Sequence, residues 1–149
     1  MSDSPVLLAD IHDIEVSIAV RDLESTTRWY QDNLGFKEAF SMDFPEYGTR
    51  LRFLELNGVF IELIQDKRWQ AMYRPDPPGH TILQGVSQIR FNVKPIEAVV
   101  ERVKARPDIR IACDLFEVGA IGFKHFFIRD NEGNIIHFAE RFAPPKRPA

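Results

Sequence analysis

One stretch decides the fold: Ile14-Glu-Val-Ser-Ile-Ala-Val-Arg-Asp-Leu-Glu-Ser-Thr-Thr-Arg-Trp-Tyr-Gln-Asp-Asn-Leu-Gly35. From Ile14 to Val20, apolar residues alternate with polar or small ones, which is the period-two pattern of a strand with one buried face. Asp22 then stands where an N-cap is expected, apolar residues recur at helical spacing, and Gly35 is a typical helix stop. The stretch therefore predicts a strand that leads into a helix.

The residues that follow complete a first half of the chain. Turn residues around Pro45 and Gly48 precede an alternating strand over about 49–56, and the turn 57–58 leads into the apolar strand 59–64. This half reads strand, helix and then two or three strands.

A second half repeats this order. Its expected elements are a strand over 86–93, a helix over about 96–105, and strands around 109–113, 123–128 and 135–139, with a turn at 130–133. Gly58-Val-Phe-Ile-Glu62 aligns with Gly133-Asn-Ile-Ile-His137. An internal repeat fixes the architecture, and this one predicts an α+β fold of two βαβββ modules.

The chain has 149 residues, which suits a single domain. Within it we expect module 1 over about 11–65, module 2 over about 85–141 and a flexible tail over 142–149. Between the modules, the linker 66–84 is rich in proline and has no predicted regular structure. A loop of this length inside a compact domain is more often functional than idle.

Composition excludes several classes of protein. The 19 basic and 22 acidic residues give a net charge of -3, so there is no basic field for nucleic acid or an anionic membrane. The single cysteine, Cys113, cannot form an intrachain disulfide, and its apolar strand makes it a core residue rather than a nucleophile. No apolar run is long enough to span a bilayer, and the N-terminus lacks a signal-peptide pattern, so we expect a cytoplasmic protein.

Strand periodicity assigns side chains to faces. Where apolar residues pack on the helices, the opposite, helix-free faces should carry four polar residues at equivalent places: Glu15, Glu62, Gln88 and His137. Arg50 and Arg52, and His125 and Phe127 in the repeat, are expected on these faces too. The alternative interpretation is that each sheet has one solvated face. Two curved half-barrels would, however, enclose a cleft in which such groups need a metal or mutual hydrogen bonds.

Two motifs resemble a known family. Val20-Arg-Asp-Leu23 with Trp29-Tyr-Gln-Asp-Asn-Leu-Gly-Phe36, and the turn Arg129-Asp-Asn-Glu-Gly-Asn134, are similar to segments of the vicinal oxygen chelate superfamily. That superfamily includes glyoxalase I, methylmalonyl-CoA epimerase, bleomycin-binding proteins and extradiol dioxygenases. The resemblance covers about Ile11 to Arg141. It implies a paired half-barrel cleft and leaves the reaction open, because one scaffold hosts many chemistries.

The resemblance also implies a metal site. Carried over by position, the ligands are Glu15, Glu62, Gln88 and His137. Glu15 and His137 depart from the family's usual residues, but the set still holds two carboxylates, an amide oxygen and an imidazole. Such a set suits a six-coordinate divalent ion (Ni, Co, Mn, Fe, Mg or Zn), with two positions left for water or substrate.

The first functional hypothesis is a metal-dependent isomerase, epimerase or lyase that moves a proton beside a carbonyl. Glu62 is the first candidate base and Glu15 the second. Arg50, Arg52 and Arg90 are candidates for binding an anionic small-molecule substrate, or else form surface ion pairs. We expect no nucleic-acid or membrane partner, and the resemblance implies a homodimer.

Two alternatives remain open. A ring-cleaving dioxygenase would use iron(II) with two histidines and a carboxylate. Here His137 is the one imidazole in the set, because His12 has the wrong parity, His80 lies in the linker, and His125 is expected to face the substrate or to support a ligand. A metal-free binding module would stack its ligand on aromatic side chains, for which Trp69, Tyr73 and Phe60 are candidates.

Overall fold

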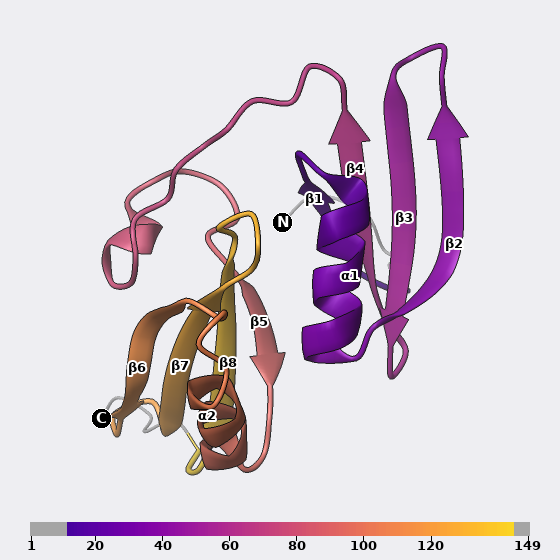
Figure 1. Ribbon diagram of the computed structural model, residues 1–149. Coiled ribbons are helices and arrows are strands. Elements are labelled where there is room, and N and C mark those ends of the chain that lie inside the picture. Colours follow the sequence, from indigo (N-terminus) through magenta and orange to yellow (C-terminus); the bar gives the residue numbers. More distant parts are fainter. Residues whose placement is uncertain (1–11, 145–149) are drawn as a thin grey trace, which may run out of the picture. The chain divides into compact units, whose positions relative to one another are not determined.

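The computed structural model describes residues 12–144, and the chain forms two compact units that divide between Trp69 and Gln70. Among the described residues, each unit has a four-stranded sheet and one α-helix, which can be followed by their labels in Figure 1. Residue 11, where module 1 was predicted to begin, and residues 145–149 of the predicted tail lie outside the described residues. Among residues 12–144, no helix is both long enough and apolar enough to cross a membrane.

Both units follow the order strand, helix and three strands. Unit 1 contains β1 (Val16–Ala19), α1 (Leu23–Leu34), β2 (Lys37–Phe44), β3 (Thr49–Leu56) and β4 (Val59–Asp66). Unit 2 contains a short 3-10 helix (Gly79–Thr81), β5 (Ile89–Asn92), α2 (Ile96–Lys104), β6 (Ile111–Val118), β7 (Phe123–Arg129) and β8 (Ile135–Arg141). The predicted α+β class and the repeated βαβββ order are confirmed.

Strand pairing is the same in the two sheets. Their strand orders are β1-β4-β3-β2 and β5-β8-β7-β6, and in each the first strand is parallel to the last. Ser17 pairs with Glu62 in the first sheet, as Arg90 pairs with His137 in the second. Glu62 and His137 therefore occupy equivalent positions.

Helix α1 begins and ends where its capping residues predict. The side chain of Asp22 accepts a hydrogen bond from the Ser25 backbone N–H at 3.0 Å, which satisfies a free donor of the first turn. Gly35 ends the helix with φ of 80°, a left-handed conformation that glycine adopts without a Cβ penalty. Leu23 and Tyr30 are fully buried on the face of α1 that packs against β3 and β4.

The core of unit 2 lies between α2 and its sheet. Ile96 and Val100 of α2 are buried, as are Phe126, Ile136 and Phe138 of the strands beneath. Apolar side chains on one stripe of the helix thus cover one face of the sheet, and the burial of each contributes roughly 1.5–3 kcal/mol. The other face is left for polar and aromatic groups.

The structure differs from the sequence prediction at an edge strand, at one strand start and in the linker. The predicted βαβββ order includes β2, but no residue range was predicted for this strand; seven of its eight residues are exposed, so no alternation of burial marks it. β5 begins at Ile89 instead of residue 86, and Val86 is exposed. The predicted linker, 66–84, begins with the last residue of β4 and includes the short 3-10 helix.

Residues 70–84 are bound to unit 2 by a buried arginine. Arg129 of β7 donates to the Asp76 carboxylate, the Gly133 carbonyl and the Arg74 carbonyl, each at 2.7 Å. Arg74 is also buried and donates to the His80 carbonyl at 2.6 Å. These bonds satisfy backbone oxygens that no sheet or helix pairs, and they hold His80 beside the sheet.

Candidate functional site

In unit 1 the helix-free face presents a hydroxyl and a carboxylate that are in contact. Ser17 donates from Oγ to Glu62 Oε2 at 2.5 Å, across the parallel pair β1 and β4. Glu62 is half-buried and Glu15 is exposed. Glu15 lies just before the first residue of β1, Val16, so strand alternation does not fix the face of its side chain. One oxygen of Glu62 is held in place by Ser17.

In unit 2 three imidazoles and an amide form a continuous hydrogen-bonded row. His80 Nε2 lies 2.5 Å from Gln88 Oε1, and Gln88 Nε2 lies 3.2 Å from His137 Nδ1. His137 Nε2 lies 2.9 Å from His125 Nδ1. All three histidines are buried, and only 3–8% of the surface of each residue is exposed to solvent. Gln88 and His137, predicted on one face, are therefore in direct contact.

The hydrogen bonds fix where each proton lies. The Gln88 amide nitrogen can only donate, so His137 Nδ1 accepts and the His137 proton is on Nε2, from which it is donated to His125. Gln88 Oε1 can only accept, so His80 donates from Nε2. His80 Nδ1 is then a bare acceptor, buried without a partner among the described residues. His137, which accepts at one ring nitrogen and donates from the other, is neutral in this arrangement.

Burial keeps His137 in this neutral form. Desolvation, followed by the nearby charges of His125, Arg90 and His80, lowers the pKa of His137 to about 4. Burial, with Arg90 next, also lowers the pKa of His125. The ring of His137 stacks on Phe127, with 4.2 Å between centroids and 10° between planes, which fixes the imidazole orientation.

The donors of the two units fit a divalent ion by their chemistry. Neutral imidazole is the form that binds a metal, and carboxylate and amide oxygens are ligands for hard divalent ions. In this structure both ring nitrogens of His137 are hydrogen-bonded, to Gln88 and to His125, so one of these bonds must break for His137 to bind an ion. Among residues 12–144, no group of three or more His, Cys, Asp or Glu side chains lies close enough together to hold a metal ion. Of the four predicted ligands, Gln88 and His137 are in contact in unit 2, and Glu62 lies on the helix-free face of unit 1.

The predicted face of Arg50 and Arg52 is wrong. In the antiparallel pair of β3 and β4, Phe53 lies opposite Glu62, whereas Arg52 lies opposite Leu63. Residues directly opposite share a face, so both arginines lie on the helix side of the sheet. The prediction was shifted by one residue. Phe53, which lies opposite Glu62 in unit 1, occupies the position that Phe127 has in unit 2, opposite His137.

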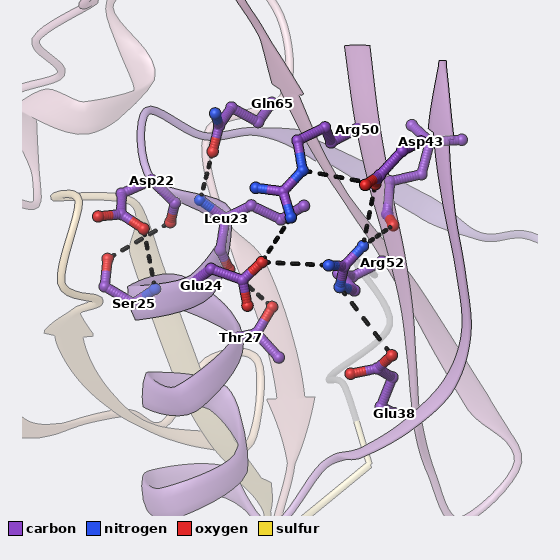
Figure 2. Close-up of polar contacts among 11 residues, drawn as sticks. Asp22, Leu23, Glu24, Ser25, Thr27, Glu38, Asp43, Arg50, Arg52 and Gln65 are labelled. Carbon is purple, nitrogen blue, oxygen red and sulfur yellow. Dashed lines mark hydrogen bonds and ion pairs between the residues drawn. The ribbon is translucent and has the colours of Figure 1, made fainter. Parts of the chain in front are cut away.

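Both guanidinium groups are engaged in ion pairs on that side (Figure 2). Arg50 binds Glu24 of α1 at 2.7 Å and Asp43 of β2 at 3.4 Å. Arg52 binds the same Glu24 oxygen at 3.1 Å and approaches Glu38 at 4.0 Å. These contacts tie the helix to β2 and β3 in unit 1.

The other predicted substrate-binding residues are placed as follows. His125 lies on the helix-free face as expected and contacts His137. Arg90 is the register partner of His137, and its Nε donates to Asn92 at 3.2 Å. Trp69 is half-buried in the turn that follows β4, where its backbone N–H donates to Asp66.

Sequence reasoning missed His80 as a partner of Gln88. No periodicity marks a histidine in a proline-rich segment, and only the fold brings it to the start of β5. Ser17 could have been found, because parallel pairing of the first and last strands of a module places it directly opposite Glu62.

Comparisons with known proteins agree with this architecture. Residues 11–138 match the model of the family described as Glyoxalase/Bleomycin resistance protein/Dioxygenase superfamily. A solved glyoxalase family protein from Enterococcus faecalis superimposes with a TM-score of 0.70 at 22% identity, covering 91% of this chain and all of that one, which supports the fold alone.

Two curated relatives are named as epimerases. The ethylmalonyl-CoA/methylmalonyl-CoA epimerase of Cereibacter sphaeroides is 26% identical over 80% of this chain and 88% of its own length. The mitochondrial methylmalonyl-CoA epimerase of Mus musculus is 28% identical over 78% of this chain, and the match spans only 65% of the mouse protein.

Proposed function

Because the chain belongs to the Glyoxalase/Bleomycin resistance protein/Dioxygenase superfamily, we propose that it is a metal-dependent isomerase, and within that class an epimerase. It would move a proton at a carbon beside a carbonyl. The observation that carries this proposal is the asymmetry of the two polar faces. Unit 1 offers a carboxylate held by a serine, and unit 2 offers an amide and a neutral imidazole.

We propose Glu15, Glu62, Gln88 and His137 as the residues that hold the ion, in one chain or between two chains of a homodimer. The internal repeat supports this set, since Glu62 and His137 have equivalent register partners. When bound, a divalent ion supplies Lewis-acid stabilisation of negative charge on neighbouring substrate oxygens. His80 supports the set by donating to Gln88 Oε1, which fixes the amide orientation.

The proton is moved by a carboxylate. Glu62 is the proposed base because the Ser17 hydroxyl holds one of its oxygens, and the other oxygen, once it leaves the ion, would accept a proton from carbon. Glu15 is the proposed second group, which would in the same way leave the ion and return a proton to that carbon. Two such groups allow removal on one side and return on the other, which is what an epimerase requires.

The names of the two relatives suggest a substrate class. Both act on malonyl thioesters that carry an alkyl branch, so we propose a branched acyl thioester as substrate. The carbon between the carbonyl and a second carboxyl group is acidic enough for a carboxylate base to act on it.

Proton exchange with solvent tests this function. The metal-loaded protein is incubated in heavy water, without oxygen, with racemic methylmalonyl thioester, and deuterium at the branched carbon is measured by mass spectrometry. We expect incorporation, and we expect Glu62→Gln to slow it by about a hundredfold or more, while Glu55→Gln, a carboxylate on the same sheet, serves as the matched control. Oxygen-dependent turnover without deuterium would indicate a dioxygenase, and no turnover of enolisable thioesters would favour a binding protein.

A further inference from the structure

Unit 2 contains a pocket that the proposed proton transfer does not use. It has a volume of about 470 Å³ and is lined by residues of β5, β7 and β8 and of the loop before α2. Its base includes Ala139, a fully buried residue with a small side chain, which pairs with Asn92 on one side and His125 on the other. The pocket is therefore on the helix-free face, next to the histidine row.

Cations dominate this pocket. Arg90, Lys94 and Arg141 line it, and Glu140 is the single acidic residue in its wall. Glu140 is buried and its Oε2 accepts the backbone N–H of Ile96 at 2.6 Å, so one carboxylate oxygen is bound to the start of α2. Three cationic groups against one carboxylate leave a net charge of +2 in the wall of the pocket.

Both guanidinium groups are positioned by an aromatic ring instead of an acid. The guanidinium carbons of Arg90 and Arg141 lie 4.3 Å and 4.5 Å from the centroid of Phe123. Among the described residues, neither arginine has an acidic side chain within 4.0 Å, whereas Arg50, Arg52 and Arg129 each do. A ring face orients a guanidinium and leaves N–H groups for an anion. In Arg90, Nε donates to Asn92, so the two terminal nitrogens are the ones that remain for an anion.

Strand geometry gives the separation from the histidine row. Arg141 follows His137 by four residues on β8, and at about 3.3 Å per residue this is roughly 13 Å. An anion held at the Arg141 end of the pocket is therefore displaced from His137 along β8, whereas the Arg90 end of the pocket lies beside His137. Such an anion would belong to the end of the ligand that lies opposite its reacting group.

We propose that this pocket is a binding site for a phosphate or carboxylate group, carried by the substrate at the end away from its reacting carbon. The assignment to the substrate depends on the proposed function, whereas the anion site itself does not. The same groups would bind a phosphate or a carboxylate, namely the guanidinium groups of Arg90 and Arg141 and the ammonium group of Lys94.

The experiment uses the metal-free full chain and two probes, pyrophosphate and succinate, titrated by calorimetry at low salt. We expect at least one probe to bind, and the probe that binds more tightly distinguishes a phosphate from a carboxylate site. Arg141→Gln should weaken binding by about tenfold or more, and Lys94→Gln should weaken it less, because a guanidinium binds in two points and an ammonium in one.

Arg102→Gln is the matched control, since this exposed arginine of α2 donates only to a backbone carbonyl of its own helix. Circular dichroism checks that all variants are folded. Failure of both probes to bind, or equal affinity in Arg141→Gln and Arg102→Gln, overturns the proposal. Because no metal or turnover is involved, these results are independent of the deuterium test. If both sites operate, Arg141→Gln should raise KM for a phosphate-bearing thioester more than for a short thioester, with kcat unchanged.

Discussion

The buried row of histidines makes the stability of unit 2 depend on pH. The pKa of His137 is about 4 in the folded protein, against 6.5 for an unperturbed histidine. Between these two values the unfolded chain binds a proton that the folded protein does not. Stability is therefore full above about pH 6.5, falls as the pH drops from there to about 4, and loses nothing further from this group below that.

The pKa difference sets the size of this effect. With 1.36 kcal/mol for each unit of pKa, a folded value near 4 and an unfolded value of 6.5 correspond to a loss of about 3 kcal/mol once the transition is complete. At pH 4.5 most of it, about 2.5 kcal/mol, should already be lost. That is a large fraction of the 5–15 kcal/mol typical of a folded domain.

Urea unfolding at pH 7.5 and at pH 4.5 measures the effect, with chelator present and circular dichroism as the signal. Other groups titrate as well, so the quantity of interest is the difference between the wild type and His137→Phe, which keeps a ring beside Phe127. The wild type should lose about 2.5 kcal/mol more than this variant. His12→Ala, a change at an exposed histidine, should behave as the wild type does. Equal losses in wild type and His137→Phe, or an imidazole signal of His137 that titrates near 6.5 by NMR, would refute the reasoning.

Three further predictions follow from single contacts. Asp76→Ala removes the carboxylate that the buried guanidinium of Arg129 binds, so the free energy of unfolding should fall by about 1–3 kcal/mol. As a control, Asp108→Ala breaks an exposed ion pair with Arg106 and should change the urea midpoint little. Gly35→Ala places a Cβ on a residue whose backbone is left-handed, with φ of 80°, and no other atom lies close to that Cβ. Backbone strain alone should therefore lower the free energy of unfolding by about 1–2 kcal/mol. An unchanged urea midpoint would contradict this. Burial raises the pKa of the Cys113 thiol, so at pH 8 this thiol should react with a disulfide reagent more slowly than free cysteine does. In urea, where the chain is unfolded, it should react as fast as free cysteine. Rapid reaction of the folded protein would show that the thiol is accessible.

Local signals in the sequence were sufficient for much of the fold. Asp22 and Gly35 predicted both ends of α1 because capping depends on a few neighbouring residues. The glycine turns before Glu62 and His137 revealed the repeat, which the paired registers confirm. The residue range of β2 was not predicted because an exposed edge strand has no buried face, as its exposed Phe40 and Met42 illustrate.

The candidate site was harder to predict, because side-chain contacts depend on register and on tertiary packing. A shift of one residue moves a side chain to the other face of a sheet, and that shift assigned Arg50 and Arg52 to the wrong side. His80 reaches Gln88 only because Arg74 and Arg129 hold residues 74–80 against unit 2. Arg141 was overlooked because the predicted last strand ended at residue 139, before the end of β8.

The central claim is that Glu15, Glu62, Gln88 and His137 hold one divalent ion with a single imidazole ligand. Titration of the full, metal-free chain with Mn²⁺, followed by pulsed electron paramagnetic resonance of the bound ion, tests it directly, because coupling to nitrogen counts the imidazole ligands. The account predicts one Mn²⁺ per chain, one coupled imidazole nitrogen, and loss of that coupling in His137→Ala but not in His12→Ala. Absence of bound Mn²⁺, or coupling to two or three imidazole nitrogens from the row of His80, His125 and His137, would contradict it.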